Sequence, residues 1–124
     1  MTPEDLNIPA VVLGAVLGFA LGAILYHPKV FGRVWAEGSG VDLGGSPPVA
    51  AFILQVLALV ALAMVIGLTA TISALFTAIF AILAATFFVV SGGAFLRKSA
   101  GALLVDGGYV LGAGILMIVA QGIL

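Results

Sequence analysis

The sequence contains no cysteine and very few charged residues, and each scarcity excludes a class of protein. Without cysteine there are no disulfides or thiolate metal ligands, and one histidine is too few for a typical zinc site, so we expect no metal and no cofactor. Charged residues make up 7% of the 124 residues, against about a quarter in soluble domains, and the net charge is -1. Such a chain offers no basic surface, so no nucleic-acid partner is expected.

Apolar residues are abundant instead, at 64% of the chain. A chain this short leaves much of its surface exposed even when folded, so this apolar surface must meet lipid rather than water. We therefore expect an integral membrane protein with membrane lipids as its immediate partners. Of the few polar residues in the apolar runs, Asn7 is expected to cap a helix and Gln55 to hydrogen-bond across helices.

Three apolar runs are long enough to cross a bilayer as helices, which takes about 20 residues for each crossing. From Val49 to Leu96 no residue is charged, and because this run is about twice the required length it must turn back. We expect the turn between Gly67 and Ser73, with Gly67 ending one helix and Thr71 or Ser73 capping the next. The predicted fold class is an all-α membrane protein, a four-transmembrane-helix bundle forming a single domain over 1–124, with spans at about 6–26, 49–68, 71–96 and 101–124.

The distribution of charge predicts the orientation of these spans. The leader 1–5 carries two acids and no base, so the first run is expected to be a retained helix rather than a signal peptide. Lys29 and Arg33 lie in the first loop, and Arg97 and Lys98 lie in the third. The positive-inside rule therefore places both loops in the cytoplasm and both termini outside, for a multi-pass protein of the plasma or inner membrane.

Glycines recur at fourfold spacing in the first and last spans. Gly14, Gly18 and Gly22 align on one face of the first helix, and Gly108 and Gly112 repeat the spacing in the last. In lipid, such small residues let two helix backbones approach closely, so we expect the two helices to pack together or to form the seam of a homo-oligomer. The alternative is that the glycines line a pore or bend a helix at a gate.

The first loop contains a short amphipathic segment at about 28–38. Phe31 and Trp35 fall on an apolar face, whereas Lys29 and Arg33 fall on a charged one. We expect an interfacial helix that lies on the cytoplasmic surface, with the aromatic residues at headgroup level and the cations near anionic lipid. A partner-binding surface or a gate is the alternative.

Asp106 is the only acid inside a predicted span. A carboxylate facing lipid is costly, so Asp106 must face something polar. Tyr26, His27 and Arg97 share its predicted side of the membrane, and Tyr109 follows it by about one helical turn. We expect a polar site of these residues in which His27 or Arg97 contacts Asp106, serving as a structural ion pair or cap or as a site that handles a proton or substrate.

One pattern resembles a known family. It consists of Gly22, Tyr26, Pro28, Phe31, Gly32 and Trp35 at their present spacing. Together with the segment 106–109, this pattern resembles the bacterial domain-of-unknown-function 1761 family (DUF1761), small membrane proteins with about four predicted helices. The resemblance covers most of the chain and implies the same fold, but it brings no activity, because the family has none assigned.

The function classes that remain are therefore broad. No phosphate-binding loop, Ser-His-Asp arrangement or pair of catalytic carboxylates occurs, so we expect no enzyme and no catalytic residues. The favoured hypothesis is a structural or accessory membrane subunit that binds a membrane-complex partner through glycine-mediated packing. The alternative is an oligomeric small transporter or channel that uses the polar site around Asp106.

Overall fold

The computed structural model describes residues 5–42 and 47–124, and in these ranges all regular secondary structure is helical, with no strand. Most of the acidic leader lies outside the described residues. Each of the four longest helices is long and apolar enough to cross a membrane, so the prediction of a multi-pass, four-helix membrane protein is confirmed. These helices are α1 (Ile8–Leu25), α3 (Val49–Ala70), α4 (Leu75–Phe95) and α5 (Ala100–Ile123). The first loop holds a π-helical turn, η2 (Pro28–Gly32), and a short helix, α2 (Arg33–Ser39).

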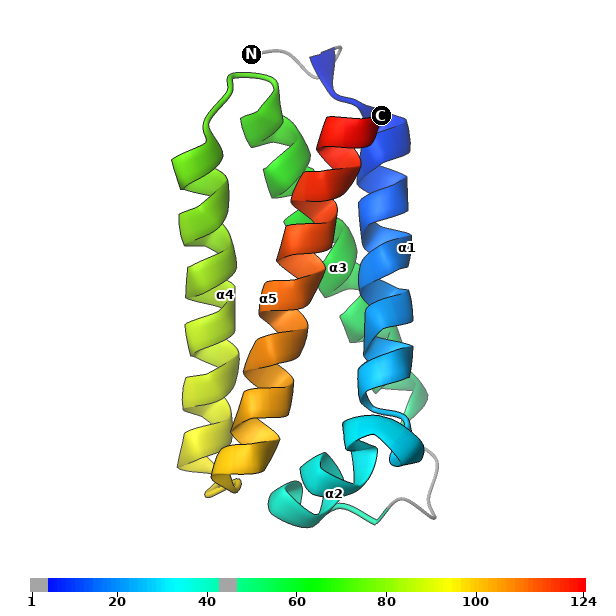
Figure 1. The fold of residues 1–124 in the computed structure, drawn as a ribbon, viewed down its shortest axis with the longest axis vertical. Helices are drawn as coiled ribbons and strands as arrows, with labels where there is room; N and C mark the ends of the chain where they lie inside the picture. Colours follow the sequence, from blue (N-terminus) through cyan, green and yellow to red (C-terminus); the bar gives the residue numbers. More distant parts are fainter. Residues whose placement is uncertain (1–4, 43–46) are drawn as a thin grey trace.

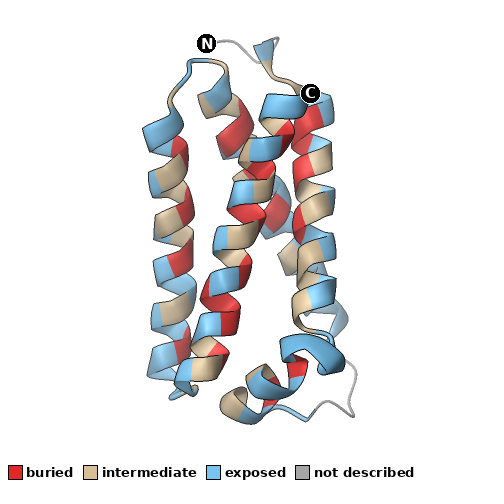
Figure 2. Ribbon diagram, viewed as in Figure 1, coloured by how far each residue is buried: buried red, intermediate tan, exposed pale blue. Residues whose placement is uncertain are grey.

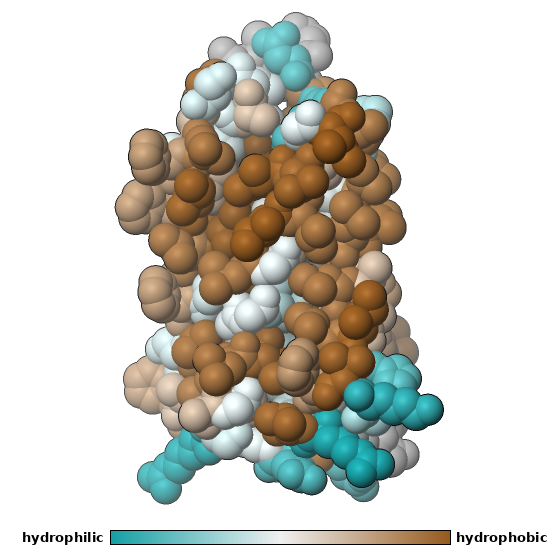
Figure 3. Space-filling model, in the orientation of Figure 1, coloured by the Kyte–Doolittle hydropathy of each residue, from teal (hydrophilic) through white to brown (hydrophobic). Residues whose placement is uncertain are grey.

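The helices run up and down, so the bundle has two distinct ends (Figure 1). We call the end near both termini and the α3–α4 turn the terminal end, and the opposite one the α2 end. Helix α2 lies beside the start of α5, where the Ser99 amide donates to the Gly38 carbonyl at 2.9 Å. The two basic loops therefore lie at the same end of the bundle, as the predicted turn within the run 49–96 requires. Hydrophilic residues gather at this end, below a broad apolar belt (Figure 3).

Side chains define several of the helix ends. The Asn7 carboxamide oxygen accepts a hydrogen bond from the Ala10 amide at 3.1 Å, which confirms the predicted cap of α1. The Ser99 hydroxyl caps α5 in the same way, accepting from the Ala102 amide at 3.1 Å. Because these caps satisfy backbone amides that have no intrahelical partner, they fix where α1 and α5 begin.

The turn between α3 and α4 lies later than predicted, because α3 continues through Gly67 to Ala70. A Cβ at Gly67 would lie 2.7 Å from Val11, so this glycine serves helix packing and does not end the helix. The expectation that Thr71 or Ser73 caps α4 is also wrong. The N-cap is Ala74, and the Thr71 hydroxyl instead donates back to the Leu68 carbonyl of α3 at 2.6 Å.

Helix α5 is the central helix of the bundle. In its most apolar window 44% of the residues are buried, against 17–22% in the other three, so α5 is the helix most covered by its neighbours. Its most extensive contact is with α1, followed by its contact with α4. Buried residues accordingly face the interior along every helix, while the outer faces are exposed (Figure 2).

The glycine face of α1 is covered by this central helix. A Cβ at Gly14 would lie 3.1 Å from Met117, and one at Gly22 would lie 3.0 Å from the ring of Tyr109, both on α5. Gly18, between them, faces the side chain of Leu59 on α3. The stripe therefore serves close packing within one chain, and its surface is occupied.

The two glycines predicted as a stripe on α5 behave differently from each other. A Cβ at Gly112 would lie 2.7 Å from Leu21 on α1, whereas one at Gly108 would meet no atom within 4 Å. A further glycine, Gly114, faces α4, where a Cβ would lie 2.6 Å from Ile82. Glycines thus bring α5 close to α1 on one side and to α4 on the other.

This difference predicts opposite outcomes for two matched substitutions in α5. Gly114→Ala forces a methyl group against the stiff, β-branched side chain of Ile82 and is expected to destabilise the protein by about 1–3 kcal/mol. Gly108→Ala enters open space and is expected to be neutral or slightly stabilising. Thermal unfolding of both variants in detergent measures the difference, and equal melting temperatures would contradict the α4–α5 packing.

Candidate functional site

The carboxylate of Asp106 is the centre of a polar cluster near the α2 end. Tyr26, which directly follows α1, donates its hydroxyl hydrogen to Asp106 Oδ1 at 2.5 Å. Lys98, just before α5, contacts Asp106 Oδ2 through Nζ at 3.0 Å. Both oxygens are therefore engaged, and Asp106 is only 7% exposed. Charge-assisted hydrogen bonds of this kind allow a carboxylate to exist within an apolar bundle.

A second hydrogen-bonded pair lies beside this cluster. Gln55 of α3 donates through Nε2 to the hydroxyl oxygen of Tyr109 on α5, which confirms the predicted interhelical role of Gln55. The Tyr109 ring packs edge-on against Tyr26, with ring centroids 5.6 Å apart. Gly22 lets the Tyr109 ring lie directly against α1, because a side chain there would overlap it. The two tyrosines thus join the two pairs into one polar cluster.

The single tryptophan of the chain packs onto the same cluster. The Trp35 ring meets Tyr26 edge-on at 5.2 Å between centroids, and Lys98 Nζ lies 5.5 Å from the Trp35 ring centroid. Its indole Nε1 is buried and has no hydrogen-bond partner in the part of the chain that the structure describes. Trp35, predicted as an outward membrane anchor, thus has its ring against the cluster, whereas Lys29, Phe31 and Arg33 are exposed.

The polar cluster forms one end of a cleft of about 730 Å³. Tyr26, Trp35, Lys98 and Asp106 line its polar end, together with Gln55 and Tyr109. The remainder is apolar, with walls that include Phe19, Leu59, Leu62 and Val110. Residues of all four long helices contribute, and α3 diverges from α4 toward the α2 end, where the cleft lies (Figure 1). The cleft therefore combines a long apolar wall with a compact polar end.

The structure brings together only some of the predicted site residues. Tyr26, Asp106 and Tyr109 meet, but His27 and Arg97 are exposed. The imidazole of His27 accepts a hydrogen bond from the amide of Lys29 within its own loop. Arg97 has a φ of 60° where α4 ends, and the next residue, Lys98, supplies the cation for Asp106. No sequence signal distinguishes two adjacent cations in a turn, so the contribution of Lys98 could not be identified in advance.

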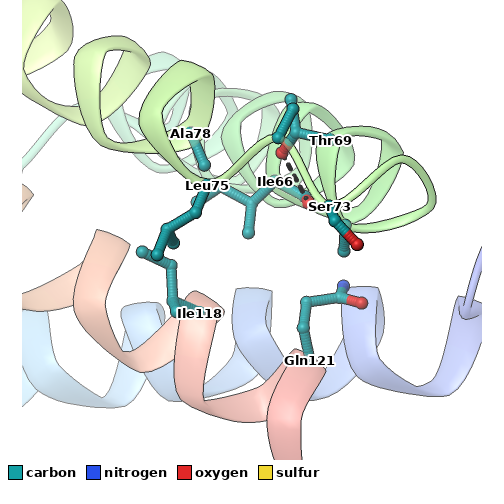
Figure 4. Close-up of a pocket in the computed structure, with 9 residues that line it drawn as sticks. Ile66, Thr69, Ser73, Leu75, Ala78, Ile118 and Gln121 are labelled. Carbon is teal, nitrogen blue, oxygen red and sulfur yellow. Dashed lines mark hydrogen bonds between the residues drawn. The ribbon is translucent and has the colours of Figure 1, made fainter.

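A smaller pocket, of about 90 Å³, lies at the terminal end between the α3–α4 turn and α5 (Figure 4). Its polar side chains include Gln121, Ser73 and Thr69, and the Thr69 hydroxyl is bonded to the Ile66 carbonyl of its own helix at 2.9 Å. It contains no charged group, and its volume is about an eighth of that of the larger cleft. The larger cleft is therefore the better candidate site.

The cleft offers few groups that could take part in acid-base or metal chemistry. Within residues 5–42 and 47–124, no three His, Cys, Asp or Glu side chains come together as they would to hold a metal ion. The acid of the cleft is already paired with Lys98, which makes it a poor free base or nucleophile. What the cleft offers is space, apolar contact and hydrogen-bonding groups.

Comparison with known proteins identifies the family of this chain. No curated protein and no solved structure matches the chain. The family model described as "Protein of unknown function (DUF1761)" matches residues 9–122, which span both the α1 and α5 sides of the cleft. The resemblance seen in the first loop and in the segment 106–109 is thereby confirmed, and the chain belongs to the DUF1761 family.

Proposed function

We propose that this protein binds an amphipathic molecule that enters the cleft from the membrane. The observation that carries this proposal is the division of the cleft into a long apolar wall and one compact polar end. Its volume of about 730 Å³ lies within the range of roughly 300–1,000 Å³ typical of small-molecule sites. A single-chain amphiphile matches this shape, because its chain can lie along the apolar wall while its head group meets the polar cluster.

The walls of the cleft support entry from the side. Phe52 of α3 and Val89 of α4 both line the cleft and are also 49% and 43% exposed. They lie on the two helices that diverge, so the cleft can open toward the lipid between α3 and α4. Three alanines, Ala51, Ala58 and Ala85, leave space in the wall that larger side chains would fill.

We further propose that the polar end of the cleft lies in the cytoplasmic leaflet of the plasma or inner membrane, with both termini outside. The four cations at the α2 end support this orientation through the positive-inside rule. In this arrangement η2 and α2 lie in the interface, with exposed Phe31 and Val34 toward lipid and Lys29 and Arg33 toward anionic headgroups.

We propose that the protein has no enzymatic activity of its own and acts as an accessory component that holds or presents its ligand. A scaffold role through the glycine stripes is less favoured, because α5 and α3 of the same chain cover the α1 stripe. Transport by a homo-oligomer is the second candidate. It is favoured by the Lys98–Asp106 ion pair at the cleft wall, since an intramembrane ion pair beside a cavity is typical of substrate pathways.

Two adjacent substitutions test the proposed binding. Trp35 is the only tryptophan and lines the cleft, so dibrominated single-chain amphiphiles that enter the cleft should quench its fluorescence saturably in phosphatidylcholine nanodiscs. Ala85→Phe fills the cleft and is expected to weaken the quenching affinity by about tenfold or more, the equivalent of about 1.4 kcal/mol. The neighbouring Ala84→Phe, on an exposed position outside the cleft lining, is the control and should leave the affinity unchanged. Non-saturable quenching that is equal in both variants would contradict the proposal.

A further inference from the structure

We infer that the cleft selects an amphiphile with an uncharged, hydroxyl-bearing head group, such as a long-chain or isoprenoid alcohol. This inference rests on the proposed function and specifies its ligand. It follows from two properties of the polar end: its charges cancel, and its unused hydrogen-bonding groups include a donor beside an acceptor.

The charges at the polar end are already compensated. Lys98 and Asp106 are the only charged residues that line the cleft within the described part of the chain, and they pair at 3.0 Å. Tyr26 bonds the second oxygen of Asp106, so both oxygens of the carboxylate have a partner. A cationic or anionic head group would have to break this pair or remain without a counter-charge, and a buried unpaired charge is costly.

The neighbouring pair retains hydrogen-bonding capacity. The Tyr109 hydroxyl accepts from Gln55, so its own hydrogen can still be donated. Gln55 uses its Nε2 in this bond, and its carbonyl oxygen has no partner among the described residues. A hydroxyl group on a ligand can accept from Tyr109 and donate to Gln55 at once, which a trimethylammonium or a sulfate group cannot do.

Trp35 also favours an uncharged, hydroxyl-bearing head group. Its buried Nε1–H is a donor with no acceptor among the described residues, at the end of the cleft where Lys98 also lies. An additional hydrogen-bond donor at this end disfavours a cationic head group. The one carboxylate among the described lining residues, that of Asp106, is already paired with Lys98. An oxygen that both accepts and donates is therefore the head-group chemistry that matches the groups present.

A matched series of probes tests this head-group selectivity. Dibromostearyl alcohol, sulfate and trimethylammonium share one chain and differ only in head group. In phosphatidylcholine nanodiscs the alcohol is expected to quench Trp35 with an affinity about tenfold or more above either charged probe, after correction for partitioning into empty nanodiscs. Equal or tighter binding of a charged probe would overturn the inference but leave the proposed function standing. Saturable quenching by none of the three probes would overturn the proposed function itself.

Two substitutions locate the selectivity in the Gln55–Tyr109 pair. Tyr109→Phe removes only a hydroxyl and Gln55→Leu replaces the amide with apolar methyl groups, and each is expected to weaken alcohol binding by about tenfold while leaving the charged probes unchanged. Gln121→Leu, the same chemical change at the terminal end and outside the cleft, is the matched control. Thermal unfolding establishes that each variant is folded. If Tyr109→Phe and Gln55→Leu are both folded and bind the alcohol as the wild-type chain does, the inference is wrong.

Discussion

Replacing Lys98 with methionine is expected to destabilise the protein by about 3–5 kcal/mol, the typical cost of removing one partner of a buried ion pair. Asp106 is only 7% exposed, and its short side chain cannot extend to the membrane surface. Without Lys98 the carboxylate retains only the hydrogen bond from Tyr26. Thermal unfolding in detergent, or chemical unfolding in bicelles, measures the loss.

The opposite variant, Asp106→Asn, is expected to cost less. The Lys98 side chain is 19% exposed at the end of the bundle, and its long stem can carry an unpaired ammonium group to the headgroup region. The double variant Lys98→Met with Asp106→Asn should recover most of the stability, because no charge remains to be buried. Additive losses in the double variant would show that the two side chains do not act as a pair.

The second large effect is expected from Gly38→Ala in α2. A Cβ at Gly38 would lie 2.0 Å from the Ser99 hydroxyl and 2.8 Å from the Ala102 side chain. The methyl group must therefore push α2 away from α5 or displace the Ser99 cap, at a combined cost of about 2–5 kcal/mol. Because Trp35 belongs to α2, its emission should shift to longer wavelength as the ring leaves the cluster.

Gly92→Ala is the control for this variant. Gly92 lies in α4, and a Cβ there would meet no atom within 4 Å, so the same chemical change should leave the emission of Trp35 unchanged and the melting temperature unchanged or slightly raised. If Gly38→Ala also left both unchanged, the contact between α2 and α5 described here would be incorrect.

The four spans could be predicted from the sequence because lipid imposes one rule on every residue of a span. A continuous apolar run of about 20 residues indicates a helix, because within one segment of the bilayer core only a helix satisfies every backbone amide. The turn near Gly67 was misplaced because a glycine that ends a helix and a glycine that admits Val11 look the same in sequence. The end of α3 is therefore determined by the packing of Gly67 against Val11 and not by the local helix propensity of glycine.

The candidate site was predictable only in part, for a related reason. Asp106, Tyr26 and Tyr109 could be grouped because Tyr26 and Asp106 are predicted on the same side of the membrane and Tyr109 follows Asp106 by about one helical turn. The choice of Lys98 over Arg97 depends on the backbone where α4 ends, and the inward position of Trp35 depends on how α2 docks against α5. The cleft itself results from the divergence of α3 from α4, which no residue pattern encodes.

The central position of α5 has a consequence for biogenesis. During synthesis α1, α3 and α4 leave the ribosome before α5, yet the glycine face of α1 and the Ile82 side of α4 both pack against α5. These three spans therefore enter the bilayer with these faces uncovered, and the faces are covered only when α5 inserts. Insertion of α5, rather than sequential addition of the earlier helices, should then be the step at which protease resistance appears.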